Sequence, residues 1–161
     1  MRPELEQGAK TLDISLRLIE DRQTQRVALM LSWLTELEEH WPDMTTEGGR
    51  VRVPSYWRAR GLLLLGQREA AAEAALRAKL IRPGDVRVAA LARRLEPRTD
   101  SVDSANGRWR PAGVDPLSAS WALAEAASFD GRPEEARRLL EPWLDDLPEL
   151  WSGYRMTSVA P

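Results

Sequence analysis

The chain has 161 residues, of which 43% are hydrophobic and 30% charged, with a formal net charge of −2 and no cysteine. This composition is typical of a globular protein with one core and excludes a disordered chain. The small net charge gives no global attraction to nucleic acid or anionic membranes, and the lack of cysteine excludes disulfides and thiolate zinc sites. Residues Met1 to Lys10 show no signal-peptide pattern and no run approaches about 18 apolar residues, so we expect a cytoplasmic protein.

Alanine, leucine, glutamate and arginine dominate the long segments, which predicts a nearly all-helical chain. Two amphipathic helices are expected first, over residues 9–22 and 25–40, and Pro42 ends the second one. Their apolar faces are marked, at three- and four-residue spacing, by Leu12, Leu16, Ile19, Val27, Leu31, Leu34 and Leu37. Trp33 and Trp57 also lie on apolar stripes, so we expect both in the core.

Proline, glycine and aspartate mark the ends of the later helices. Pro54 suits the first position of a helix, and Asp85 and Asp115 suit the cap positions before two others. The expected helices span residues 54–65, 68–81, 86–95, 116–129 and 133–142, with a kink or break near Pro142 and a short helix over 143–151. Residues 97–114 are rich in Ser, Asp, Asn, Gly and Pro, which predicts a loop inserted between helices.

Two stretches of the chain carry the same frame of three residues. A glycine is followed five residues later by an alanine, and twelve residues after that by a proline. The two sets are Gly66, Ala71, Pro83 and Gly131, Ala136, Pro148. The frame puts glycine at a turn, a small residue where two helices cross, and proline after the second helix. It predicts two similar helical hairpins, each with an apolar face that only a neighbour can bury.

This frame resembles the tetratricopeptide repeat, whose unit is a pair of antiparallel helices of about 34 residues. The resemblance implies an all-α fold in which antiparallel hairpins stack as a short α-solenoid, in a single domain over residues 1–161. The implied units are 52–85, 117–150 and a degenerate unit over 9–42, in which Gln25 stands where the turn glycine belongs.

The resemblance also implies that the first helix of each unit lines a concave groove. The residues on that face are Tyr56, Arg60 and Leu63 in one unit and Trp121, Glu125 and Ser128 in another. Aromatic and charged side chains in this arrangement can hold an extended peptide or a partner helix. The alternative is that Tyr56 and Trp121 are ordinary core residues. Trp109, between two arginines in the loop, either contacts a partner or folds back onto the helices.

These features predict a non-catalytic protein–protein interaction module, such as an adaptor, a chaperone or an accessory subunit. The sequence contains no phosphate-binding glycine loop, nucleophile motif or series of metal ligands, so we expect no catalytic residue, metal or cofactor. The expected partner is a protein or peptide. A second copy of the chain is a further partner, since a short array leaves open apolar ends, and no membrane partner is expected.

Two other functions stay open. One is a small helical subunit of an enzyme complex. The other is a DNA-binding regulator, because residues 88–107 superficially resemble a helix-turn-helix of the lactose-repressor type. In that segment Glu96 and Pro97 replace the turn glycine and its neighbour, which makes nucleic acid the less favoured partner. The side chains that would contact phosphates are Arg93, Arg94 and Arg98.

Overall fold

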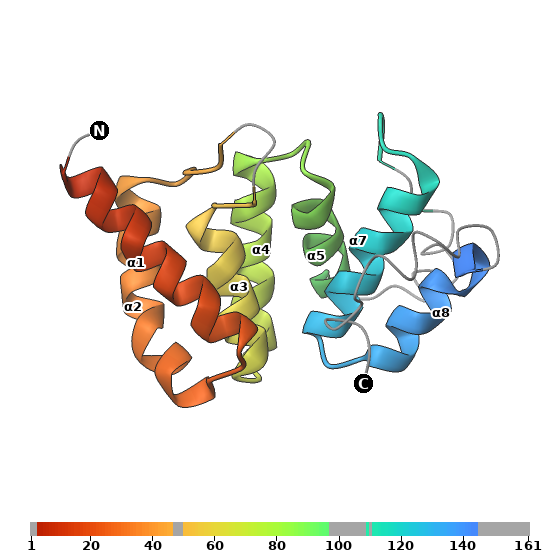
Figure 1. Ribbon diagram of the computed structural model, residues 1–161, viewed down its shortest axis with the longest axis horizontal. Coiled ribbons are helices and arrows are strands. Elements are labelled where there is room, and N and C mark those ends of the chain that lie inside the picture. Colours follow the sequence, from red (N-terminus) through yellow and green to blue (C-terminus); the bar gives the residue numbers. More distant parts are fainter. Residues whose placement is uncertain (1–2, 47–49, 97–108, 110, 145–161) are drawn as a thin grey trace. The chain divides into compact units, whose positions relative to one another are not determined.

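The computed structural model describes residues 3–46, 50–96, 109 and 111–144. Within these ranges the chain forms seven α-helices and no β-strand, which confirms the predicted all-α fold (Figure 1). The helices are α1 (Pro3–Glu20), α2 (Thr24–His40), α3 (Pro54–Leu64), α4 (Arg68–Ile81), α5 (Val86–Leu95), α7 (Pro116–Phe129) and α8 (Pro133–Leu144). In the part of the chain that the structure describes, no helix has the length and apolarity needed to cross a membrane.

Two predicted helix boundaries are wrong. The first helix begins at Pro3 rather than at residue 9, because Glu4 and Glu6 in its first turn interact favourably with the helix dipole. Pro142 does not end the last helix, which continues to Leu144. Proline has no N–H to donate to the carbonyl four residues earlier, so the helix loses one hydrogen bond at Pro142.

Two further predictions fall mainly on residues outside the described ranges. The short helix predicted over 143–151 overlaps the described part of the chain only at the last two residues of α8. Of the loop predicted over 97–114, the structure describes residues 109 and 111–114, where the N–H of Val114 donates to the carbonyl of Pro111.

The chain divides into two compact units, Met1–Pro83 and Gly84–Pro161. In the first unit α3 packs against α1, α2 and α4, and α1 packs against α2. In the second unit α7 packs against both α5 and α8. The predicted single array over residues 1–161 would require the two units to stack on each other, and that arrangement stays a prediction.

The core of the first unit forms where α3 enters between α1 and α2. The apolar faces predicted for α1 and α2 are buried there, and Trp57 is buried as predicted. A Cβ atom on Gly61 would lie 3.1 Å from Val27 and 3.3 Å from Leu31, so a larger residue here would press on these side chains of α2. The buried side chains of α1 and α2 include Leu12, Leu16, Ile19, Val27, Met30, Leu34 and Leu37.

One turn geometry closes three hairpins: α1–α2, α3–α4 and α7–α8. In each turn one residue has a positive φ: 56° at Arg22, 77° at Gly66 and 71° at Gly131. Its N–H donates to the carbonyl three residues earlier, and the next N–H donates to the carbonyl five residues earlier, at 2.9–3.1 Å. This is the Schellman arrangement, which satisfies the last carbonyls of the first helix and reverses the chain.

The turn of the first hairpin corrects the predicted repeat frame. Gln25 was expected at the turn position, but it lies inside α2, and Arg22 occupies the turn. The error arises because α2 has 17 residues whereas α4 has 14, so counting back from Pro42 points one turn too late. Five residues after the turn, the buried side chain is Val27 in the first hairpin and alanine in the other two.

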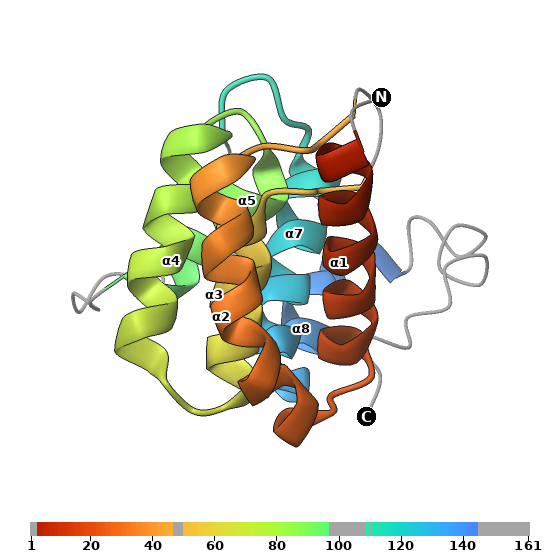
Figure 2. The ribbon, with the colours of Figure 1, turned by 90° about the vertical axis from the view of Figure 1, so that its left-hand side faces the viewer.

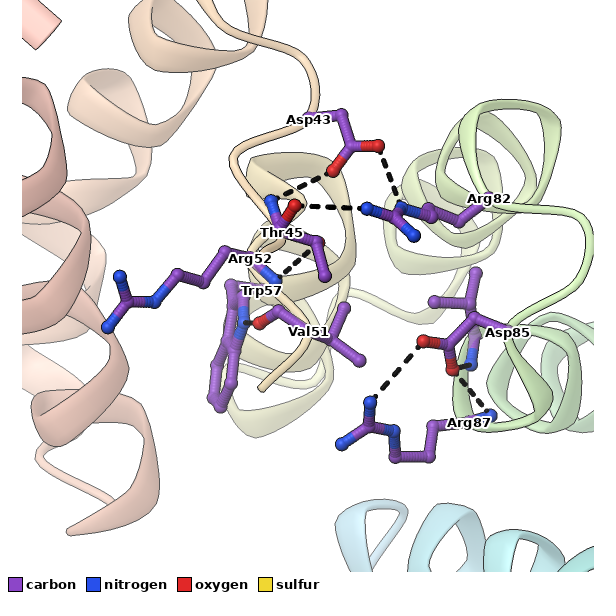
Figure 3. A network of polar contacts seen from close by, with 9 residues as sticks. Asp43, Thr45, Val51, Arg52, Trp57, Arg82, Asp85 and Arg87 are labelled. Carbon is purple, nitrogen blue, oxygen red and sulfur yellow. Dashed lines mark hydrogen bonds and ion pairs between the residues drawn. The ribbon is translucent and has the colours of Figure 1, made fainter. Parts of the chain in front are cut away.

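A polar contact ties the loop after α2 to the end of α4 (Figure 3). The Asp43 carboxylate accepts a hydrogen bond from Nε of Arg82 at 2.7 Å and from the backbone N–H of Thr45 at 2.9 Å. Partial burial disfavours the charged carboxylate, but the hydrogen bonds from Thr45 and Arg82 outweigh this, so the pKa of Asp43 lies below its usual value. The loop is therefore held at the C-terminal end of α4.

In the second unit, two aspartates cap helices as predicted. Asp85 accepts the N–H groups of Arg87 and Val88 at the start of α5, as Figure 3 shows. Asp115 accepts both the N–H and the hydroxyl of Ser118 at the start of α7, and these two bonds lower the pKa of Asp115. Both caps satisfy N–H groups that have no partner inside the helix.

A buried ion network joins α5 to the turn of the α7–α8 hairpin. The Arg94 side chain is only 5% exposed, and its Nε donates to Asp130 at 3.0 Å. The two terminal nitrogens of Arg94 donate to the two carboxylate oxygens of Glu135, at 2.7 Å for Nη2. Burial opposes the charge, but the hydrogen bonds that Arg94 donates to Glu135 and Asp130 outweigh it and raise the pKa of Arg94.

The turn geometry predicts opposite effects for two kinds of substitution. Arg22→Gly removes the left-handed strain of a side chain at a positive φ and should raise the free energy of unfolding by about 0.5 kcal/mol. Gly66→Ala and Gly131→Ala introduce the same strain and should each lower it by about 1 kcal/mol. Urea unfolding followed by circular dichroism measures all three. No atom lies within 4 Å of a Cβ placed on Gly66 or Gly131, so a steric clash would not explain the losses.

The buried network predicts a large loss of stability when one partner is removed. Arg94→Ala leaves Asp130 and Glu135 without their buried counter-ion and should lower the free energy of unfolding by about 3 kcal/mol. The matched control is Arg87→Ala, because Arg87 forms a half-exposed ion pair with Asp85 and its loss should cost less than about 1 kcal/mol. Equal losses in the two variants, measured by urea unfolding, would contradict a special role for Arg94.

Candidate functional site

An open groove of about 910 Å³ runs between α1 and α2 on the side of the hairpin away from α3. Figure 2 shows the first unit with α1 and α2 in front and α3 behind them. Each wall of the groove is one face of a helix. The wall from α1 consists of Glu4, Gln7, Thr11 and Ile14, and the wall from α2 consists of Trp33, Glu36 and His40. Residues at this spacing lie above one another on a helix, which makes each wall continuous.

The floor of the groove depends on a glycine. Gly8 lies at the bottom with Leu37 and the indole of Trp41. A Cβ atom on Gly8 would lie 2.6 Å from Cζ3 of Trp41, which no real contact allows. Because Gly8 has no side chain, the Trp41 ring can lie directly on the backbone of α1. The missing side chain at Gly8 therefore sets the depth of the groove at its floor.

Large apolar side chains border the groove and reach solvent. Ile14 on α1 is 54% exposed and Trp33 on α2 is 51% exposed. Leu29 lies one turn before Trp33 on α2 and is also exposed. The prediction that Trp33 belongs to the core is therefore wrong, because α2 turns a different face toward α3. An exposed apolar strip beside a groove is typical of a surface that binds a partner.

Two of the polar residues that line the groove are acidic. Glu4 and Glu36 are exposed, one on each wall. The Nδ1 atom of His40 lies 3.0 Å from the carbonyl oxygen of Glu36, and its ring lies against Trp41 with centroids 5.7 Å apart. The groove thus combines an apolar centre with two carboxylates at its edges, and it favours a partner that carries positive charge beside an apolar stripe.

The face predicted on α3 is not a free surface. Tyr56 is 3% exposed and packs edge-on against Trp57, so the alternative interpretation of Tyr56 as a core residue is confirmed. The guanidinium of Arg60 lies 4.3 Å from the centroid of the Trp57 ring, a cation–π contact. Leu63 is half-buried. Tyr56 and Arg60 thus stabilise α3 within the first unit, and contact of this face with a partner stays a prediction.

The predicted contact residues of the second unit also have internal partners. Trp121 is half-buried, packs against the core of the α7–α8 hairpin, and donates its indole N–H to Glu125 at 3.1 Å. Trp109 is half-buried with the guanidinium of Arg93 at 5.8 Å from its ring centroid. The stripe on α3 and the stripe on α7 belong to different units, and a single groove lined by both stays a prediction.

The sequence contained a signal for the α1–α2 groove. Leu29, Trp33, Glu36 and His40 recur at intervals of four, three and four residues, which places them on one face of α2. A second apolar stripe on the other side of α2, which includes Val27 and Leu34, was assigned to the core. A neighbouring helix can cover only one face of such a helix, so the second apolar face is a candidate binding surface. The geometry of Gly8 and Trp41 had no comparable signal, because it joins two helices.

The described residues hold no group of three or more histidine, aspartate or glutamate side chains placed to bind a metal ion. Comparison of the chain with protein-family models, with curated proteins and with solved structures found no match. The function of the protein is therefore inferred from the geometry of the groove and of the hairpins alone.

The floor of the groove predicts a local effect of Gly8→Ala. The added methyl group must displace the Trp41 ring, since the two would otherwise overlap. In a 1H–15N spectrum, the indole N–H signal of Trp41 should shift more than any other indole signal. A Trp41→Phe variant assigns that signal. An unchanged Trp41 signal in folded Gly8→Ala would show that the ring does not lie on Gly8.

Proposed function

We propose that this protein is a non-catalytic protein-binding module built from tetratricopeptide-like hairpins, and that the α1–α2 groove holds an amphipathic helix of its partner. An adaptor, a chaperone and an accessory subunit of an enzyme complex all work in this way. The proposal includes the cytoplasmic location expected from the sequence.

Two features of the hairpins support the repeat-like part of the proposal. Three hairpins share one turn geometry, with matching hydrogen bonds and a positive φ at the same position. In the first unit α3 packs against both helices of the preceding hairpin, as the first helix of each following unit does in a helical repeat array. Among the described residues of the first unit, no helix covers the outer side of the α1–α2 hairpin, the side away from α3.

The single observation that supports binding is the groove on that outer side. It has an apolar centre, an open side, and a half-exposed tryptophan at its border. Tryptophan dominates many protein interfaces, because its ring buries a large area and its N–H can still find a partner. A helix fits a groove between two helices through apolar residues at positions i, i+4 and i+7. The carboxylates of Glu4 and Glu36 favour lysine or arginine beside that stripe.

The structure weakens the DNA-binding alternative. Arg94, one of the three arginines expected to contact phosphates, is buried and engaged by Asp130 and Glu135. Arg93 lies against Trp109, and Arg98 lies outside the described residues. The segment thus lacks a group of arginines directed at solvent among the residues that the structure describes.

The test uses a pair of labelled helical peptides of equal length. Both carry leucines at positions i, i+4 and i+7, but one has lysines beside the leucines and the other has glutamates. Fluorescence anisotropy should show the basic peptide binding at least about tenfold more tightly than the acidic one. Trp33→Ala should weaken binding of the basic peptide at least about tenfold, because a central aromatic contact is lost.

A matched pair of charge reversals separates the groove from the general charge of the protein. Glu36→Lys lies on a groove wall and should weaken binding of the basic peptide, whereas Glu141→Lys lies exposed on α8 and should leave it unchanged. Failure of the basic peptide to bind, or equal binding of that peptide by wild type and folded Trp33→Ala, would refute the proposed function.

A further inference from the structure

The first unit carries a second exposed apolar surface, on α4. Leu76 and Leu80 are 49% and 80% exposed and lie one helical turn apart on the outer side of this helix. The opposite side of α4 packs into the core through Ala71, Ala74, Ala75 and Ala78. These alanines are enough to pack the inner side of α4 into the core of the first unit. The two leucines on its outer side are exposed and contribute nothing to that packing.

The two exposed apolar surfaces of the first unit are complementary. Among the described residues, the large exposed apolar side chains lie either at the α1–α2 hairpin or on α4. The hairpin presents a groove with Glu4 and Glu36 on its walls. The end of α4 presents a convex strip whose neighbours include Arg77, with 60% of its side chain exposed, and Lys79. The basic side chains beside the strip are thus opposite in charge to the carboxylates of the groove, and a helix face can lie in a groove between two helices.

A single chain cannot join these two surfaces. Both α4 and the α1–α2 hairpin are fixed in the same unit, and α3 packs against all three of these helices. Glu38 of α2 lies near Arg77 of α4, but it lies on the other side of α2 from Glu36 and the groove. The strip on α4 can reach a groove only in another molecule.

We infer that a second copy of the chain docks the C-terminal half of its α4, with Leu76 and Leu80, into the α1–α2 groove. This inference rests on the proposed helix-binding function of the groove and names its partner. The contact is heterologous, so a dimer still has one unoccupied groove and one unoccupied strip, and oligomers grow with concentration. A symmetric contact of two grooves is disfavoured, because it brings Glu4 and Glu36 of both copies into one interface.

The test is a complementation experiment with two variants of the full chain. Leu80→Glu disables the strip but keeps the groove, and Trp33→Glu disables the groove but keeps the strip. In sedimentation velocity, wild type should form concentration-dependent oligomers, and each variant alone should associate at least about tenfold more weakly. An equimolar mixture of the two variants should form a heterodimer through the intact groove of one variant and the intact strip of the other. It should grow no further, because the groove and the strip that remain are the two disabled ones.

Several outcomes would overturn the inference. Oligomers of Leu80→Glu that match wild type would show that α4 does not take part, and a mixture that stays monomeric would show that groove and strip do not meet. Ile14→Glu replaces Trp33→Glu if circular dichroism shows that the tryptophan variant is unfolded. A monomeric wild type that still binds the basic peptide would overturn self-docking while leaving the helix-binding function intact. Failure of monomeric Leu80→Glu, whose groove is intact and unoccupied, to bind the basic peptide would refute that function, and this inference with it.

Discussion

The architecture depends on one backbone constraint: the second residue after the first helix of each hairpin must adopt a positive φ. Only this conformation lets two consecutive N–H groups reach back to the last carbonyls of the helix while the chain reverses. Glycine meets the requirement without cost at Gly66 and Gly131, whereas the α1–α2 turn places Arg22 there against the preference of its side chain. Once the three turns are made, the second helix of each hairpin must lie along the first.

Hairpins formed in this way cannot bury all their apolar surface alone. In the first unit, α3 covers one side of the α1–α2 pair, and the close approach at Gly61 makes that contact tight. Among the described residues of the first unit, no helix packs on the other side of the pair, and there Ile14 and Trp33 border an open groove. The proposed binding surface thus belongs to the same hairpin whose other side packs into the core.

Polar interactions set the positions of the loops and turns that the apolar core leaves undefined. Asp43 and Arg82 hold the loop after α2 against the end of α4, so this loop is tied down within the first unit. In the second unit Arg94 joins α5 to the turn of the next hairpin, where apolar packing alone would allow the helix to slide. A buried arginine with two carboxylates accepts one geometry, and so it selects one register.

The sequence by itself determined the all-α class, most helix boundaries, both aspartate caps and the two glycine turns, because these features depend on residues close together in the chain. It could not place the positive φ at Arg22, because arginine, unlike glycine, is not a residue type that marks this conformation. The faces expected to bind were assigned from a repeat pattern, and the structure places Tyr56 in the core and Trp33 at the surface instead. Which side of an amphipathic helix meets a neighbour depends on contacts between segments far apart in sequence. The groove with Gly8, Trp33 and Trp41 depends on such contacts between α1 and α2, so only the tertiary structure decided where it lies.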